Sequence, residues 1–390
     1  MPALGVQAAG PASIIAWAGL LVLSAPLAVT FAALAVRYPV SGGVAEYARA
    51  GFGDAAAAVT GDWFVGAVVL GGPAVALIGG YYVADLVGSG STSVAVGAAI
   101  AMFAIVLLSN ALGLRLSSAF QLGLSTVLVA VLAVAIGVAL PTHGGDNWIP
   151  FAPYGWLAVG TAANILVWLF VGWEAVAQLA GEFRRPGIDL PRAMAVAFAV
   201  VTVLYISLAV ATIGVTGHSQ SRVPLADLIA VGFGHAGRVA TAVLAVALTM
   251  GTMNVYIGGT AKLVKALAEE GALPSWFAVG ERSVPLRPLL VFASTGALLL
   301  AALAAGWLNA TDLVRATSSL FVAVYVLTIA SAVRILRGPT RAAAVAAVIM
   351  VALIALFSGW YVAVPVAIAL VAFGALVIRP RHPVSKHSRS

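Results

Sequence analysis

A single carboxylate stands deep inside an apolar stretch of this chain. Glu174 lies in the second half of the otherwise uncharged run from Leu157 to Gly181, and no other ionisable side chain is as far from the ends of a comparable run. A charged group so far from water costs several kcal/mol unless it is protonated or lies in a polar cavity. We therefore predict a functional role for Glu174, such as proton coupling. The alternative is a structural hydrogen bond to the neighbouring backbone.

The residues before Glu174 predict a break in the element that carries it. The segment reads Trp168-Leu169-Phe170-Val171-Gly172-Trp173, with large aromatics on both sides of a glycine. Glycine allows a helix to break or to approach a ligand closely. Broken helices at mid-membrane are where many transporters expose backbone groups to a substrate. The alternative is that Trp168 and Trp173 face lipid or the membrane interface.

Three further residues are weaker candidates for contact with a ligand. Gly71 and Gly72 precede Pro73 in a second apolar run, where they allow close helix packing or a kink. Asn254 lies in a third run, and polar side chains there commonly hydrogen-bond to a neighbouring helix. For all three residues, helix packing is the favoured role and ligand contact the alternative.

The motifs of several other chemistries are missing from the sequence. There is no cysteine, no GxxxxGK[ST] phosphate-binding loop, and no nucleophile elbow or HExxH pattern. The histidines lie in predicted loops or the C-terminal tail, with no pair at metal-ligand spacing inside an apolar run. We therefore predict no enzyme activity, no cofactor and no metal site.

The composition places the elements that carry these residues in a lipid bilayer. Of the 390 residues, 62% are hydrophobic and 8% charged, with a mean hydropathy of +1.09, whereas an average soluble domain is about 25% charged. A helix needs about 20 apolar residues to cross a bilayer. Eleven runs predict spanning helices: Ser13–Val36, Trp63–Ala84, Thr92–Leu114, Leu116–Leu140, Leu157–Gly181, Ala193–Gly217, Val239–Ala261, Pro288–Thr311, Ala316–Val333, Ala342–Phe357 and Gly359–Ile378.

The basic residues fall on one face of this arrangement. When successive loops alternate between the two sides, all of the 20 Lys and Arg residues except Arg222, Arg238 and Arg315 lie on the same side. This asymmetry marks the cytoplasmic face of a membrane protein. The C-terminus is therefore predicted to be cytoplasmic, and the net charge of +7 is explained without a nucleic acid partner.

The first ten residues do not fit the pattern of full spans. Met1 to Gly10 is apolar but would be only about 15 Å long as a helix. Eleven crossings that end inside place Met1 outside or within the membrane. We therefore expect that the sequence as given lacks the inner half of a first helix, and that the intact protein has twelve helices.

Two loops on the basic face have a distinctive residue order. One runs Arg37-Tyr38-Pro39-Val40-Ser41-Gly42-Gly43, with Glu46 and Tyr47 downstream, and the other contains Glu182-Phe183 and continues from Pro186 to Pro191 and Arg192. With the segment Phe170 to Glu174, and Asn254-Val255-Tyr256 leading to Lys262-Leu263-Val264, they resemble the amino acid, polyamine and organocation transporter superfamily. Within it, the chain is similar to bacterial exporters of methionine and branched-chain amino acids.

The resemblance implies an all-α integral membrane fold of the leucine-transporter type. This fold has two five-helix repeats of inverted topology followed by two extra helices. On this chain it implies one transporter domain over residues 1–378. The divisions are a truncated first repeat at 1–140, a second repeat at 157–333, two accessory helices at 342–378 and a basic cytoplasmic tail at 379–390.

The resemblance also implies a substrate site between broken first and sixth helices, completed by the third, eighth and tenth. Trp168 matches the gating aromatic, Val171 and Gly172 the unwound stretch that faces the substrate, and Glu174 the acidic position after it. The predicted substrate-binding residues are Trp168, Phe170, Val171, Gly172, Trp173, Gly71, Gly72 and Asn254. The family's G-[ST]-G break in the first helix would lie just before Met1, so the sequence as given is expected to bind substrate poorly or not at all.

Together these observations predict a secondary transporter of amino acids in a bacterial plasma membrane. We expect alternating access, small hydrophobic substrates (methionine, leucine, isoleucine and valine) and export by proton antiport. One alternative is an uptake permease driven by protons or sodium, and another is a transport-inactive sensor or assembly partner. The expected partners are the amino acid, protons and the lipid bilayer, and the protein is expected to be a monomer or a homodimer.

Overall fold

The computed structural model describes residues 2–38, 43–113, 118–139, 145–175, 183–216, 222–279 and 285–378. Within these ranges all regular secondary structure is helical. Nine of the described helices are long and apolar enough to cross a membrane, and two further apolar helices, Leu157–Phe170 and Gly359–Ala375, are shorter. The predicted all-α membrane architecture is confirmed.

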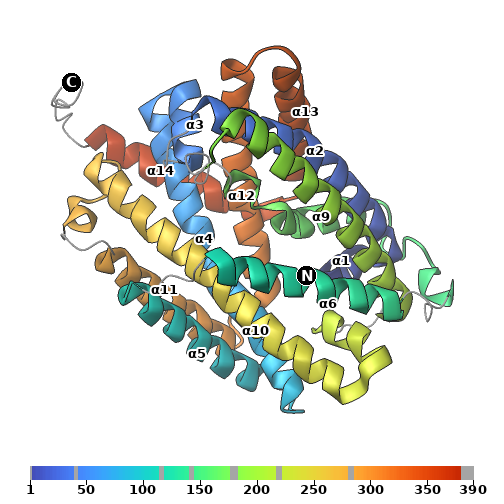
Figure 1. The fold of residues 1–390 in the computed structure, drawn as a ribbon. Coiled ribbons are helices and arrows are strands. Elements are labelled where there is room, and N and C mark those ends of the chain that lie inside the picture. Colours follow the sequence, from blue (N-terminus) through green and yellow to red (C-terminus); the bar gives the residue numbers. More distant parts are fainter. Residues whose placement is uncertain are drawn as a thin grey trace.

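The helices form one bundle, drawn in Figure 1. The α-helices are α1 Pro2–Ala9, α2 Ser13–Arg37, α3 Gly43–Phe52, α4 Asp54–Leu86, α5 Thr92–Ala111, α6 Ser118–Ala139, α7 Leu157–Leu166, α9 Pro186–Thr216, α10 Pro224–Glu269, α11 Leu286–Ala304, α12 Ala310–Ile335, α13 Gly338–Ala355 and α14 Ala363–Ile378. The 3-10 helices are η1 Gly10–Ala12, η3 Gly145–Trp148, η4 Val167–Phe170, η5 Trp173–Ala175, η7 Ser275–Ala278 and η8 Gly359–Val362.

Helices α4 and α12 lie at the centre of the bundle. α4 packs against α5, α10 and α12, and 72% of the most apolar stretch of α12 is buried, compared with 17% in α13. Glycines allow this close packing in α4, because a Cβ on Gly80 would lie 2.1 Å from the backbone oxygen of Ala95 in α5. These two helices form the frame against which the candidate site is built.

Two helices extend well beyond the predicted apolar runs. α4 begins at Asp54 rather than at Trp63, and α10 begins at Pro224 rather than at Val239. The prediction started each span after the charged residues of the preceding segment. A helix can continue past the membrane interface, where such side chains reach water.

The predicted span Pro288–Thr311 was wrong at its C-terminal end, because it is longer than the helix that the structure has there. α11 ends at Ala304, and Gly306 adopts a φ of +74° directly after it. This left-handed conformation is common in a residue that follows a helix, and glycine adopts it without a steric penalty. α12 then begins at Ala310 and takes the end of the predicted run.

Several predictions lie outside the described residues. These are the loop residues Pro39–Gly42, Gly181 and Glu182, the predicted span ends at Leu114, Leu116, Leu140 and Gly217, the basic residues Arg115 and Arg282, and the tail at 379–390. The division of the chain into two repeats, at 1–140 and 157–333, and two accessory helices at 342–378 stays a prediction.

The short helix α3 joins the ends of three long helices at the arginine-rich end of the bundle (Figure 1). Arg49 of α3 forms ion pairs with Asp54 at the start of α4 and with Glu270 just after α10. Arg334 of α12 donates a hydrogen bond to the backbone oxygen of Gly51 in α3. Arginines from separate loops therefore meet at one end, in agreement with the predicted charge asymmetry.

A second ion-pair group lies at the opposite end. Arg238 of α10 pairs with Asp85 at the end of α4 at 3.0 Å, and with Asp227 in the first turn of α10 at 2.8 Å. Between Asp227 and Arg238, α10 kinks at Gly234, whose φ and ψ are +53° and −137°. The ion pairs therefore hold the two parts of α10 to each other and to α4.

Candidate functional site

The α-helical hydrogen-bonding pattern of the predicted span Leu157–Gly181 ends at Leu166, near the middle of the span. It tightens to the 3-10 helix η4, becomes extended at Val171 (φ −73°, ψ 136°) and turns at Gly172, whose φ is +135°. The 3-10 helix η5 follows at Trp173–Ala175. Gly172 allows this geometry because L side chains rarely adopt that φ. We call Trp168–Glu174 the helix break.

α1 and α2 hold the first half of this span in place. α1 packs directly on α7, and a Cβ on Gly5 would lie 2.9 Å from the Leu166 side chain. The backbone N–H of Ala12, between α1 and α2, donates to the backbone oxygen of Phe151 at 2.8 Å. The N-terminal segment therefore holds in place the residues that lead into the helix break.

Glu174 turns back to bind the helix break that precedes it. Its Oε2 accepts a hydrogen bond from the backbone N–H of Gly172 at 2.8 Å and another from the hydroxyl of Tyr325 in α12. The side chain is only 4% exposed. Its other oxygen, Oε1, is buried and has no hydrogen-bond partner among the described residues. Glu174 thus forms the structural hydrogen bond to neighbouring backbone that the sequence suggested as an alternative, and its Oε1 is not used in it.

Trp168, Gly71 and Thr317 converge from three elements. A Cβ on Gly71 of α4 would lie 3.2 Å from Trp168 Cζ2 and 3.1 Å from Thr317 Cγ2 of α12. Trp168 and Gly71, two of the predicted substrate-binding residues, therefore lie next to each other beside the helix break. The absence of a side chain at Gly71 leaves room for the indole ring.

The structure separates Gly72 and Asn254 from this convergence. Gly72 faces α5, since its Cβ would lie 3.1 Å from the ring of Phe103. Asn254 of α10 accepts a hydrogen bond at 2.8 Å from the side-chain amide of Asn110 in α5. Both residues make helix–helix contacts, and their predicted contact with substrate stays a prediction.

The remaining aromatics anchor the helix break to α2 and α9. Phe170 is buried and packs its ring against Trp17 of α2 and Tyr205 of α9, with centroids 6.0 and 5.3 Å away. The Tyr205 hydroxyl also donates to the backbone oxygen of Leu169 at 3.1 Å. Trp173 donates its indole N–H to Ser24 of α2 at 3.0 Å. Phe170 and Trp173 are therefore both attached to α2, the first by a ring contact and the second by a hydrogen bond.

α12 contributes the residues that sequence reasoning missed. Tyr325 binds Glu174, and the hydroxyls of Thr317, Ser318 and Ser319 are buried without a hydrogen-bond partner in the described ranges. The signal was present, because these polar side chains interrupt an apolar run. A search restricted to ionisable groups passes over hydroxyls.

The arrangement offers contacts suited to a small zwitterion with an apolar side chain. The carbonyls at the C-terminal end of the continuous helix formed by α7 and η4 carry a partial negative charge and favour an ammonium group. The hydroxyls of α12 can donate or accept hydrogen bonds, and Trp168 presents an apolar ring. Across the residues that the structure describes, no group of three or more His, Cys, Asp or Glu side chains is placed to hold a metal ion.

Known proteins match most of the chain. The family described as "Amino acid permease" matches residues 1–387. The chain is 33% identical to the "Uncharacterized amino acid permease YecA" of Bacillus subtilis, over 95% of this chain and 88% of that protein. It is 27% identical to the "L-methionine/branched-chain amino acid exporter YjeH" of Escherichia coli, over 92% and 87%. It is 26% identical to the "Methylthioribose transporter" of Bacillus subtilis, over 69% and 62%. These relatives are named as permeases and transporters rather than enzymes.

Proposed function

The chain belongs to the amino acid permease family, and we propose that it exports small hydrophobic amino acids by proton antiport. It is a multi-pass membrane protein, and amino acid transport is the activity that its family implies. The observation that carries the finer proposal is the helix break at Val171–Gly172, whose backbone is tied to a buried carboxylate that is itself tied to α12.

The substrate class follows from the groups around the helix break. Glu174 is the buried carboxylate there, and the other contacts are the indole of Trp168 and the hydroxyl groups of α12. A charged substrate side chain would need a second buried charge of opposite sign to offset its desolvation. An apolar side chain needs no such charge, so only the ammonium and carboxylate common to all amino acids have to be bound. Methionine, leucine, isoleucine and valine fit this requirement, and the relative YjeH is named for methionine and branched-chain amino acids.

In this proposal, Glu174 links its own protonation to the position of the helix break. A carboxylate is a stronger hydrogen-bond acceptor than a protonated carboxyl group. Deprotonated Glu174 therefore holds the N–H of Gly172 and the hydroxyl of Tyr325 firmly, which ties the break to α12. Protonation, with Oε1 as the free position, weakens both bonds and releases the break to move relative to α12. Proton uptake and substrate release then use the same contacts.

Alternating access would require the helix break and its anchors to move together. Phe170 and Trp173 attach the break to α2 and α9, whereas Gly71 and Thr317 belong to the central frame of α4 and α12. Trp168 contacts the frame and could close over a bound side chain when the two parts approach. In this scheme Trp168 acts as the gate.

We place the protein in a bacterial plasma membrane with its arginine-rich end and its C-terminus in the cytoplasm, as a monomer or a homodimer. An uptake permease driven by protons or sodium is the second candidate, since the hydrogen bonds of Glu174 work in either direction. A transport-inactive sensor would keep the same fold without flux.

Counterflow in proteoliposomes tests the transport proposal. The purified protein is reconstituted with a high internal concentration of one unlabelled amino acid, and the entry of labelled leucine, valine, methionine, lysine and glutamate is measured. We expect exchange of the three hydrophobic amino acids and little of the charged ones. Preferred exchange of lysine or glutamate would overturn the substrate class. Flux that depends on a sodium gradient and not on a pH gradient would overturn proton antiport, and no flux with any amino acid would favour the sensor.

A further inference from the structure

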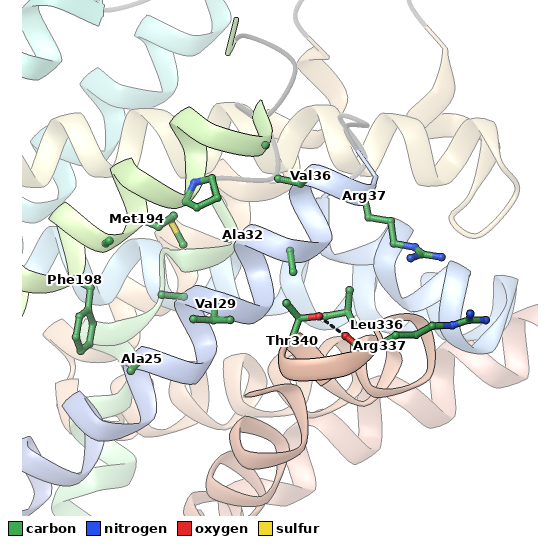
Figure 2. A pocket seen from close by; sticks show the side chains of 15 residues that line it. Ala25, Val29, Ala32, Val36, Arg37, Met194, Phe198, Leu336, Arg337 and Thr340 are labelled. Atoms are coloured by element: carbon green, nitrogen blue, oxygen red, sulfur yellow. Dashed lines mark hydrogen bonds between the residues drawn. The ribbon is translucent and has the colours of Figure 1, made fainter. Parts of the chain in front are cut away.

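A groove with a volume of about 610 Å³ lies between α2, α9 and α13, apart from the helix break (Figure 2). Its lining comes from the second half of α2, the first part of α9, and the turn that leads from α12 into α13. None of its lining residues belongs to the helix break. The mechanism proposed above does not use it.

The floor of the groove is made of alanines. Ala25, Ala28, Ala32 and Ala33 of α2 line it, and their short side chains leave space between Met194 and Phe198 of α9 and Thr340 of α13 (Figure 2). Val29, also on the lining, is 47% exposed, and Val22 one helical repeat earlier is 64% exposed. In a bilayer, apolar side chains exposed on a spanning helix face acyl chains. The groove therefore opens to lipid along α2.

One end of the groove carries two arginines. Arg37 ends α2 and Arg337 precedes α13, and both side chains are exposed and line the groove. Figure 2 shows them extending toward the same side of the view, away from Met194 and Phe198. Neither guanidinium forms an ion pair with a carboxylate of the described chain, and no acidic residue is among the described residues that line the groove.

Two helix beginnings add to this positive end. Gly187 in the first turn of α9 and Thr340 in the first turn of α13 both line the groove. The Thr340 hydroxyl donates to the backbone oxygen of Arg337 at 2.9 Å, which fixes the turn that carries this arginine. Helix N-termini favour anions, so they act in the same direction as the two guanidinium groups.

We propose that this groove is a binding site for an anionic phospholipid of the leaflet at the arginine-rich end. Arg37 and Arg337 bind the headgroup phosphate, and one acyl chain lies along the alanine floor between α9 and α13. Guanidinium groups bind phosphate oxygens in a bidentate manner, and basic pockets between membrane helices on the cytoplasmic side bind anionic headgroups. A second copy of the chain fits less well, because a symmetric contact here would bring four unpaired arginines together.

Native mass spectrometry of the full-length protein tests the site. The purified protein is mixed with dioleoyl phosphatidylglycerol or with dioleoyl phosphatidylcholine, which have the same acyl chains and differ in headgroup charge. We expect the first phosphatidylglycerol to bind at least about tenfold more tightly than phosphatidylcholine, since each basic residue near an anionic headgroup contributes about fivefold. Equal binding of the two lipids would overturn the proposal.

Three variants locate the binding. Arg37→Gln combined with Arg337→Gln should remove the preference for phosphatidylglycerol, whereas Arg341→Gln, an exposed arginine of α13 that does not line the groove, should keep it. Val29→Trp fills the groove and keeps both charges, so it should weaken binding of both lipids. If Arg341→Gln matches the double variant, the effect is general surface charge and the site is wrong. Unchanged lipid binding in Val29→Trp would likewise contradict the groove as the site.

Discussion

Two glycines interrupt helices of this protein, and their surroundings differ. Gly172 turns the chain at the helix break, deep in the bundle, where Glu174 and Tyr325 hold its backbone N–H by hydrogen bonds. Gly234 kinks α10 near one end, where the partly exposed ion pairs of Arg238 bridge the kink. At both positions an added Cβ would meet no atom within 4 Å.

The comparison separates a functional interruption from a structural one. Exposed and partly exposed ion pairs contribute about 0–1 kcal/mol and are replaceable by water. A buried carboxylate cannot be replaced in this way, because removing its partners leaves an uncompensated charge or polar group. We therefore expect changes at the helix break to act on transport, and changes at the α10 kink to act mainly on stability.

The largest effect is expected from alanine at the two glycines. Both residues have a positive φ, so an alanine at either position strains the backbone by about 1–3 kcal/mol. The added Cβ would meet no neighbouring atom at either position, so this strain is the main cost in both cases. Gly172→Ala should lower leucine exchange by about tenfold or more, whereas Gly234→Ala should lower the melting temperature and leave exchange close to wild type. Equal losses of exchange at both positions would remove the distinction between the two interruptions.

A smaller loss is expected at the proposed gate. Trp168→Ala removes the ring that contacts Gly71 and Thr317, and it should weaken leucine binding by roughly tenfold. Trp173→Ala removes an indole that bonds Ser24 of α2 instead, so it should lower the melting temperature more than the affinity. Leucine affinity and melting temperature measured on both variants test this. Equal effects on affinity would show that Trp168 does not act as the gate.

Loss of the Tyr325 hydroxyl is expected to lower pH-driven transport by a few fold. Tyr325→Phe removes the hydrogen bond to Glu174 and should reduce pH-driven flux about fivefold, since a typical hydrogen bond contributes about 1 kcal/mol net and Glu174 keeps its bond from Gly172. Tyr361→Phe is the matched control, because that hydroxyl binds Asp312 away from the helix break. Unchanged flux in Tyr325→Phe would show that the hydrogen bond from α12 to Glu174 does not contribute to proton coupling.

The smallest effect is expected at the kink of α10. Arg238→Gln removes the ion pairs to Asp85 and Asp227, which should cost about 1 kcal/mol or less because these side chains reach water. We expect a drop of a few degrees in melting temperature, reduced further by salt screening, and leucine exchange near the wild-type rate. A loss of exchange as large as that of Gly172→Ala would contradict the view that this end is only structural.

Several features of the fold and of the candidate site could be predicted from the sequence alone. Apolar runs predicted the spanning helices, and the isolated glycine between large aromatics predicted the helix break that the structure has. The depth of Glu174 in its run predicted its burial. These features are local, so a single stretch of sequence contains the whole signal.

What the sequence could not supply were contacts between distant segments. Tyr325 is far from Glu174 along the chain, and only the packing of α12 against the helix break brings them together. The same holds for Thr317 with Gly71, and for the arginines of the groove. Helix ends were also misjudged, because a charged residue such as Asp54 ends an apolar run without ending the helix.

Glu174→Gln tests the central claim, that this carboxyl couples protons to transport. Glutamine keeps an oxygen that can accept the bonds from Gly172 and Tyr325, but it cannot release a proton. Leucine exchange and pH-gradient-driven leucine flux are measured on the same reconstituted sample. We predict that exchange survives while gradient-driven flux is lost. Gradient-driven flux equal to wild type would contradict the account and leave Glu174 as a structural tie between the helix break and α12.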